Sequence, residues 1–224
     1  MDVREPHSWP VDVAEATALQ LALRPLVRLE SELAEPLRRV AGLDVTYEPS
    51  SSRVAAAVVV MAADDFSVLE EQIVVDTVDF PYAPGLFAFR ELPPLVKALR
   101  KISAVPDVLL CDGHGIAHPR RFGLACQLGL LTGLPAVGVA KTILVGDFSP
   151  LAAERGAREP IVDQGETVGF ALRTSTNVKP VFVSPGHLVT LDDAARLVLR
   201  CSPSYRLAEP IRRADHISRQ ALRS

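Results

Sequence analysis

The chain has 224 residues, a formal net charge of −3 and 48% apolar side chains. This length suits one large domain or two small ones, and this apolar content is enough to form a full core. A slightly acidic chain does not bind nucleic acid by bulk positive charge, so any such binding requires local arginines and a metal ion.

The apolar runs and the cysteines indicate the cellular setting. The longest apolar run, residues 54–63, is too short to cross a bilayer and lacks the basic flank of a signal peptide. The chain has three cysteines, which is an odd number, and their spacing is not that of a metal site. We therefore expect Cys111, Cys126 and Cys201 to be reduced, structural thiols. We expect a soluble, cytoplasmic protein without membrane contact, and a monomer.

The first half of the chain predicts a helix, three strands and two further helices. Leucines recur on one helical stripe of the first helix, which Pro25 and Pro36 should kink or bound. Short polar separations between the strands fit an antiparallel meander. Pro93 and Pro94 should separate the last two helices. The predicted elements are a helix at 12–39, strands at 40–47, 53–62 and 67–77, and helices at 86–90 and 94–102.

The second half alternates strands and helices. The run 108–111 is continuously apolar, as expected for a strand covered on both faces. The predicted elements are strands at 108–111, 136–140, 168–173 and 181–184, and helices at 122–132, 191–199 and 210–222. Antiparallel strands followed by alternating helices and parallel strands predict an α/β fold, one mixed sheet flanked by helices, in a single domain over 1–224.

The most informative segment is 106–121, in which the apolar strand 108–111 ends at Asp112 and opens into a loop rich in glycine, histidine and arginine. Such strand ends are where α/β proteins bind ligands. Asp44 lies in strand 40–47, which we expect to neighbour strand 108–111. Two adjacent carboxylates repel unless a cation separates them, and oxygen ligands suit Mg²⁺ or Mn²⁺. The alternative is that each aspartate caps a turn or a helix.

Three further charged residues are candidates for the same site. Glu91 follows a helical turn that should be buried, so its carboxylate needs a partner. Asp215 shares a helix face with apolar residues, although pairing with Arg212 or Arg219 at the surface is equally compatible with the sequence. Lys141 ends a strand, where it either meets a phosphate or is simply solvated.

Two motifs allow a structural interpretation as well as a functional one. His114 and His118 suit ligation or proton transfer, but loop histidines are more often hydrogen-bonded structural residues. A zinc site does not fit, because no cysteine lies in this cluster and no HExxH motif occurs. Pro81 and Pro84 stiffen the turn around Tyr82, which indicates an aromatic wedge for a base stack or a rigid turn that caps the core. Physical reasoning alone favours the rigid turn.

Taken together, these segments resemble the endonuclease V family over residues 12–222. The matching pieces keep their order and spacing, and the two richest are specific in combination. They are Ala-Gly-Leu-Asp-Val-Thr-Tyr at 41–47, Pro-Tyr-Ala-Pro-Gly-Leu-Phe-Ala-Phe-Arg-Glu at 81–91, Asp-Gly-His-Gly-Ile-Ala-His-Pro-Arg-Arg-Phe-Gly-Leu-Ala at 112–125, Gly-Val-Ala-Lys-Thr at 138–142 and Val-Ser-Pro-Gly-His at 183–187.

The resemblance implies an RNase H-like fold with a mixed five-stranded sheet, three of whose strands are antiparallel. It implies a DNA repair endonuclease that cuts the second phosphodiester bond 3′ to deoxyinosine and leaves a 3′-hydroxyl and a 5′-phosphate. It also implies a requirement for Mg²⁺, with Mn²⁺ as a substitute.

The resemblance assigns roles to individual residues. Asp44 and Asp112 would be metal ligands, Glu91 would complete the acidic site and Lys141 would lie near the scissile phosphate. Family members have His or Asp near position 215, and we expect Asp215 rather than His216 to act here. Tyr82 would be the wedge. The remaining expected DNA contacts are a base pocket at Gly85, Phe87, Gly113, Gly123 and Leu124, a contact from His118, and phosphate contacts from Arg120, Arg121, Arg212 and Arg213.

Several alternatives remain at this point. Ala83 and Leu92 depart from the residues common in relatives, which affects lesion preference rather than the acids. The preferred polymer is open, since some relatives act on inosine in RNA. An RNase H-like nuclease with another substrate is one rival. A non-catalytic nucleic-acid-binding module whose acids cap loops is another.

Overall fold

The computed structural model describes residues 1–4 and 8–223. Its elements, in chain order, are α1 Val13–Leu23, the 3₁₀ turn η1 Arg24–Leu26, β1 Arg39–Tyr47, β2 Arg53–Ala62, β3 Val68–Thr77, α2 Ala88–Lys101, β4 Val108–Cys111, α3 Leu124–Thr132, β5 Ala136–Ala140, β6 Arg158–Asp163, β7 Glu166–Leu172, β8 Val181–His187, α4 Leu191–Arg200 and α5 Glu209–Ala221.

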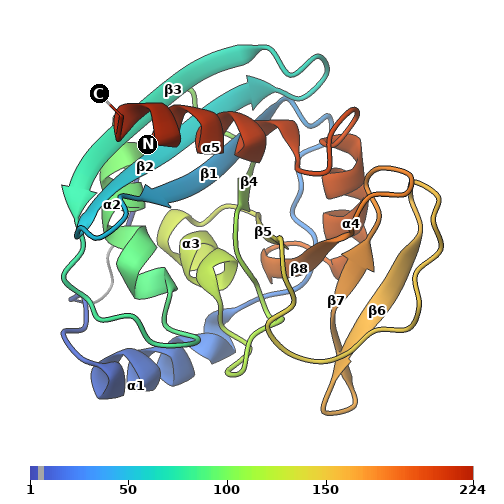
Figure 1. Ribbon diagram of the computed structural model, residues 1–224, viewed down its shortest axis with the longest axis horizontal. Coiled ribbons are helices and arrows are strands. Elements are labelled where there is room, and N and C mark those ends of the chain that lie inside the picture. Colours follow the sequence, from blue (N-terminus) through green and yellow to red (C-terminus); the bar gives the residue numbers. More distant parts are fainter. Residues whose placement is uncertain (5–7, 224) are drawn as a thin grey trace.

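One mixed sheet runs through the molecule, with helices on both of its faces (Figure 1). Within the described residues it has eight strands in the order β3-β2-β1-β4-β5-β8-β7-β6. Strands β1, β2 and β3 form the predicted antiparallel meander, and β4 and β5 run parallel to β1. The α/β class is therefore confirmed, whereas the expected five strands are extended by the antiparallel strands β8, β7 and β6.

Alternating side chains of the strands fill two cores on opposite faces of the sheet. Ala41 and Leu43 of β1 pack with Leu109 of β4 beneath α2 and α3, while Val40 and Leu110 pack against α4 and α5. Val40 to Leu43 pair in register with Val108 to Cys111, and the amide of Asp112 donates to the Leu43 carbonyl at 3.2 Å. Continuing this register sets Asp44 opposite Asp112 at the carboxyl end of the parallel strands.

Two helix predictions are wrong, and each concerns a segment that contains prolines. The expected helix 12–39 ends at Leu23 and passes into η1, which contains Pro25, after which the chain is extended at Val27. Leu33 and Leu37 are partly buried against the α4 and α5 side of the core, so their spacing reflects docking of an irregular segment.

Pro93 and Pro94 do not separate two helices, because both lie inside the continuous helix α2. Their missing N–H groups leave carbonyls of the preceding turn without intrahelical partners. Burial of Leu92, Leu95 and Leu99 along one face of α2 offsets this cost.

Strand β6 is absent from the prediction because its sequence contains Pro160 and three charged residues. It pairs with β7 through a two-residue turn at Gln164 and Gly165, both at positive φ (54° and 81°). This is the twist that two-residue hairpins require. Among the described residues, no helix combines the length and the hydropathy that a bilayer span requires.

Close packing of α5 on β1 depends on Gly42. A Cβ built at this position would lie 2.0 Å from the carbonyl carbon of Pro210 and 2.2 Å from its oxygen. Both are backbone atoms, so they cannot rotate away. Gly42 therefore allows the first turn of α5 to lie directly on the strand that carries Asp44.

Gly42→Ala should lower the free energy of unfolding by about 2 kcal/mol, because it forces α5 away from β1. Urea unfolding followed by circular dichroism measures this change. Ser52→Ala, at an exposed hairpin, should stay within about 0.5 kcal/mol of the parent. A Gly42→Ala protein as stable as this control would contradict the packing interpretation.

Candidate active site

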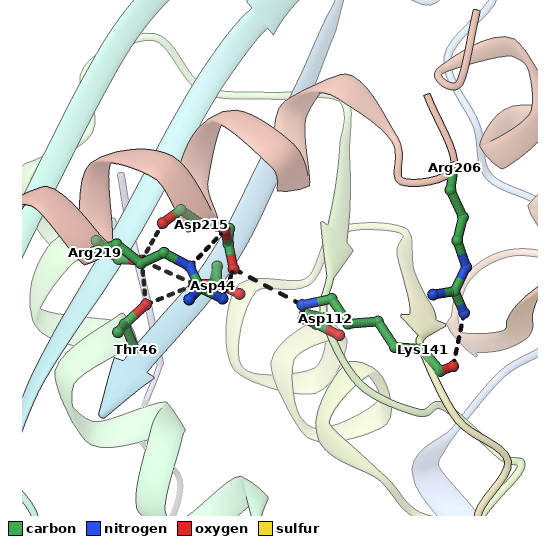
Figure 2. A network of polar contacts seen from close by, with 8 residues as sticks. Asp44, Thr46, Asp112, Lys141, Arg206, Asp215 and Arg219 are labelled. Atoms are coloured by element: carbon green, nitrogen blue, oxygen red, sulfur yellow. Dashed lines mark hydrogen bonds and ion pairs between the residues drawn. The ribbon is translucent and has the colours of Figure 1, made fainter. Parts of the chain in front are cut away.

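Acidic groups from separate elements meet at the carboxyl ends of β1, β4 and β5. Asp44 lies near the end of β1 and is 6% exposed, and Asp112 follows β4 directly. Lys141 follows β5, and its Nζ contacts Asp112 Oδ2 and lies 3.8 Å from Asp215 Oδ1 of α5 (Figure 2). Glu91 of α2 is 3% exposed and close enough to Asp44 and Asp112 for their charges to raise its pKa. The five predicted residues therefore gather in one site.

Hydroxyl groups orient the Asp44 carboxylate. Ser218 of α5 is fully buried, and its Oγ donates to Asp44 Oδ2 at 3.0 Å. Thr46 Oγ1 lies 2.7 Å from Ser218 Oγ and completes a chain of hydroxyls from β1 to α5 (Figure 2). Aspartates that cap loops accept backbone N–H groups, whereas this one is held by side chains, so the capping alternative does not fit Asp44.

Mutual repulsion and burial favour the protonated forms of two of these acids. Burial, followed by the charges of Asp112 and Asp215, raises the pKa of Asp44 to about 6. Burial, followed by the charges of Asp44 and Asp112, raises the pKa of Glu91 well above its usual value. A cation among the three carboxylates would reverse both effects, because a nearby positive charge favours ionised acids.

The donor set suits a hard divalent cation. Carboxylate oxygens with space for water and phosphate are what Mg²⁺ and Mn²⁺ take, and Asp44 and Asp112 supply them. In the part of the chain that the structure describes, no three acidic, histidine or cysteine side chains converge as a finished metal cluster. The Lys141 ammonium lies against Asp112 instead, and the Asp112 charge raises the Lys141 pKa against the opposing effect of burial.

Asp215 pairs with an arginine on its own helix and also faces the acidic site, so both interpretations of its sequence position are correct. Its two carboxylate oxygens accept from Arg219 at 2.8 Å each, which, with the Arg219 charge, holds the Asp215 pKa below its usual value. The same carboxylate faces Lys141 across the site. Arg212 pairs with Glu209 rather than with Asp215.

A pocket of about 280 Å³ lies beside the acids. Its lining includes seven residues predicted for DNA contact: Tyr82, Gly85, Phe87, Gly113, His118, Gly123 and Leu124. Gln20, His114 and residues 142–144 also line it and were not predicted. The signal for Gln20 is a polar side chain on the buried face of α1, which it shares with Ala16.

His118 has a structural place in this pocket. It is 3% exposed, its Nε2–H donates to the Gly85 carbonyl at 2.8 Å, and its Nδ1 accepts from the Arg120 amide at 3.2 Å. Burial lowers the pKa of His118, and likewise that of His114, to about 4. Both imidazoles are therefore neutral near pH 7, and His118 has no ring nitrogen left for a metal.

The four arginines expected to contact phosphate are engaged within the protein. Arg120 donates to the Gly85 carbonyl at 2.8 Å, Arg212 pairs with Glu209, and Arg213 pairs with Glu71. Arg121 is 8% exposed and pairs with Asp163 at 2.8 Å and Glu166 at 2.7 Å. Burial of Arg121 argues against the expected phosphate contact, and its charge instead fastens the loop after β4 to the β6–β7 hairpin.

Replacement of Asp44 by Asn should stabilise the metal-free protein near neutral pH. The folded protein keeps the Asp44 proton between about pH 4 and 6, where the unfolded chain has released it, so folding stability falls as pH rises through this range. Asp44→Asn removes this loss and should add roughly 1–3 kcal/mol at pH 7. Thermal unfolding in EDTA from pH 4 to 8 measures the effect.

The gain should shrink toward pH 4, because Asp44 is then neutral in both states. Added Mg²⁺ should raise the melting temperature of the parent and leave that of Asp44→Asn nearly unchanged. A variant that is less stable than the parent at pH 7 in EDTA would show that Asp44 is not under electrostatic strain.

Comparison with known proteins agrees with this geometry. The endonuclease V family model matches residues 22–216. Endonuclease V of Nostoc sp. is 44% identical over 97% of this chain and 99% of its own, and that of Streptomyces avermitilis is 46% identical over 99% of this chain and 97% of its own.

Solved structures agree with these relatives. The crystal structure of the Streptomyces avermitilis enzyme has a TM-score of 0.91 at 45% identity and covers 100% of this chain and 98% of its own. A Ciona intestinalis endonuclease V, in complex with a 24mer DNA containing an inosine followed by a ribo-adenosine, has a TM-score of 0.83 at 28% identity over 94% of this chain and 98% of its own. The protein described here belongs to the endonuclease V family of nucleases.

Proposed function

We propose that this nuclease nicks DNA at the second phosphodiester bond 3′ to deoxyinosine in a reaction that requires Mg²⁺ or Mn²⁺. The observation that carries the proposal is the pocket of about 280 Å³ directly beside the acidic site. A flipped base in this pocket would leave the neighbouring backbone over Asp44 and Asp112. The complex of the Ciona intestinalis relative with inosine-containing DNA supports this choice of lesion.

In this proposal Asp44 and Asp112 hold the ion, and Glu91 and Asp215 border it. The bound ion supplies charge neutralisation of the phosphate and an acidified water. The attacking water adds to phosphorus, and the bond from phosphorus to the 3′ oxygen breaks, which leaves a 3′-hydroxyl and a 5′-phosphate. The Lys141 ammonium, 37% exposed and held beside Asp112, offsets negative charge that develops during this step.

The carbonyl of Lys141 is also held in place. Arg206 donates to it at 2.8 Å (Figure 2). Arg206 also donates to the Pro180 carbonyl at 2.8 Å, so the chain after β5 is tied to the start of β8. Preorganised charge at the reacting phosphate stabilises the transition state without a reorganisation cost. The backbone of Lys141 therefore provides a fixed base for a side chain that moves between Asp112 and substrate.

Action on inosine in RNA is the second candidate function. The DNA in the Ciona intestinalis complex carries a ribo-adenosine after its inosine, so a related protein binds a strand with a ribonucleotide at that position. Matched single-inosine DNA and RNA substrates, assayed side by side, decide the preferred polymer here.

Asp112→Asn should lower the nicking rate by more than about 100-fold while it retains binding, because it removes one ligand and leaves the pocket intact. A 5′-labelled duplex with one inosine, incubated with Mg²⁺ or EDTA and resolved at nucleotide level, measures both rate and cut position. Asp64→Asn, in the exposed β2–β3 turn, is the matched control. Full activity of Asp112→Asn in Mg²⁺, or parent activity in EDTA, would overturn the metal assignment.

Tyr82→Ala should weaken binding of inosine-containing duplex about tenfold, since loss of one base–aromatic stack costs on this order. Tyr82 is 74% exposed at the pocket rim, and Tyr205, 53% exposed and outside the pocket lining, provides a matched aromatic control. Fluorescence anisotropy in EDTA reports the affinity without cleavage. If Tyr82→Ala binds as tightly as Tyr205→Ala, the ring is no wedge and the rigid-turn interpretation holds.

A further inference from the structure

One backbone carbonyl beside the pocket accepts more hydrogen bonds than it needs. The Gly85 oxygen receives donors from Gln20 Nε2 at 3.0 Å, His118 Nε2 at 2.8 Å and Arg120 Nη2 at 2.8 Å. A carbonyl has two lone pairs, so three donors, two of them from the loop after β4 and one from α1, exceed what solvation of this group requires. The convergence therefore fixes the position of the Gly85 peptide.

Gln20 ties this arrangement together. It is fully buried, and its amide nitrogen donates a second hydrogen bond to the Phe122 carbonyl at 3.1 Å. Its Oε1 accepts from Arg120 Nε. One side chain on α1 thus uses both amide hydrogens and its oxygen to join Gly85 to the segment 120–122.

The backbone conformation at Gly85 favours glycine, and a side chain there would displace the clamping groups. The φ of Gly85 is +75°, and a Cβ at this position would lie 2.8 Å from Arg120 Nη2 and 3.3 Å from His118 Nε2. The Leu86 amide donates to the Ala83 carbonyl at 3.0 Å and closes the turn. Arg90 holds the Phe80 carbonyl at the other end of the segment. The exposed ring of Tyr82 therefore stands between two anchored carbonyls.

We propose that Gln20, His118 and Arg120 form a clamp, and that Gln20 is a positioning residue that sets lesion selection through the Gly85 peptide. This inference rests on the proposed function. Gly85 and Gly113 contribute only backbone to the pocket, so discrimination of a base depends on where those peptide groups lie. A shift of about 1 Å in a positioning group is enough to cost a large factor in rate. Gln20 lies outside residues 22–216, the span that the family model matches.

Three variants separate the clamp from ordinary packing. Gln20→Leu removes every hydrogen bond of the amide, and Gln20→Glu keeps the size and the Arg120 contact but turns an acceptor toward the Gly85 and Phe122 carbonyls. Gln127→Leu is the matched control. Gln127 is also fully buried, but its amide nitrogen and oxygen have no hydrogen-bond partner within the described residues, so its replacement breaks no such contact.

The first measurement needs no substrate. Hydrogen exchange of the amides in residues 82–87 should become about tenfold faster in Gln20→Leu and Gln20→Glu, because loss of a buried hydrogen bond raises the equilibrium constant for local opening by about that factor. Exchange in the same segment should be unchanged in Gln127→Leu. Unchanged exchange in both Gln20 variants would overturn the clamp whatever the enzyme cleaves.

The second measurement tests lesion selection. In EDTA, both Gln20 variants should lose about tenfold in affinity for an inosine duplex and less than about twofold for the same duplex with a baseless tetrahydrofuran site. In Mg²⁺, most of the loss in kcat/KM on inosine should appear in KM. Equal losses on both duplexes would show a role for Gln20 in overall stability only and overturn the positioning role. A parent protein that neither nicks nor prefers inosine would overturn the proposed function, while the exchange result still decides the clamp.

Discussion

Crowding of negative charge at the carboxyl ends of the parallel strands is the constraint on which the rest of the structure depends. The register of β1 and β4 sets Asp44 opposite Asp112, and Glu91 approaches from α2. Burying like charges together costs free energy, which hydrophobic packing of the sheet and its helices must offset. Lys141, and for Glu91 also Arg90, compensate this charge only in part, because the pKa values of Asp44 and Glu91 stay raised. The free energy gained by packing the two apolar cores thus stabilises the fold against the repulsion among these acids.

Apolar runs with short polar separations were sufficient to predict the central strands and the antiparallel meander. The pairing of β1 with β4 was expected from the tendency of sequential strands to lie side by side. The local sequence pattern gave wrong predictions where tertiary contacts determine the backbone conformation. Leu33 and Leu37 are spaced as in a helix but dock from an irregular segment, and Pro93 stays within α2 because the core side of that helix is buried.

In the site, too, some residues were predictable from the sequence and others depend on tertiary contacts. Asp44, Asp112 and Lys141 each lie at a strand end, so the sequence placed them at one edge before any contact was known. Gln20 gave no comparable signal, since its partners are 65 to 102 residues away along the chain. The apolar strand that ends at Asp112 identified the glycine-rich loop, and its arginines were expected to contact phosphate. Whether an arginine faces solvent or a protein acid is set by packing, and here Arg121 faces acids.

The two ion pairs of Arg121 have a consequence for how this fold can be divided. The hairpin β6–β7 lies beyond the five central strands and looks like a removable extension in the ribbon (Figure 1). Its Asp163 and Glu166, however, neutralise a guanidinium that is 8% exposed beneath the loop after β4. Deletion of the hairpin would remove both acidic partners of Arg121 and expose its guanidinium to solvent. For this chain the outer hairpin and the glycine-rich loop are therefore one electrostatic unit, and trimming the fold to the central sheet would release the loop from its anchor.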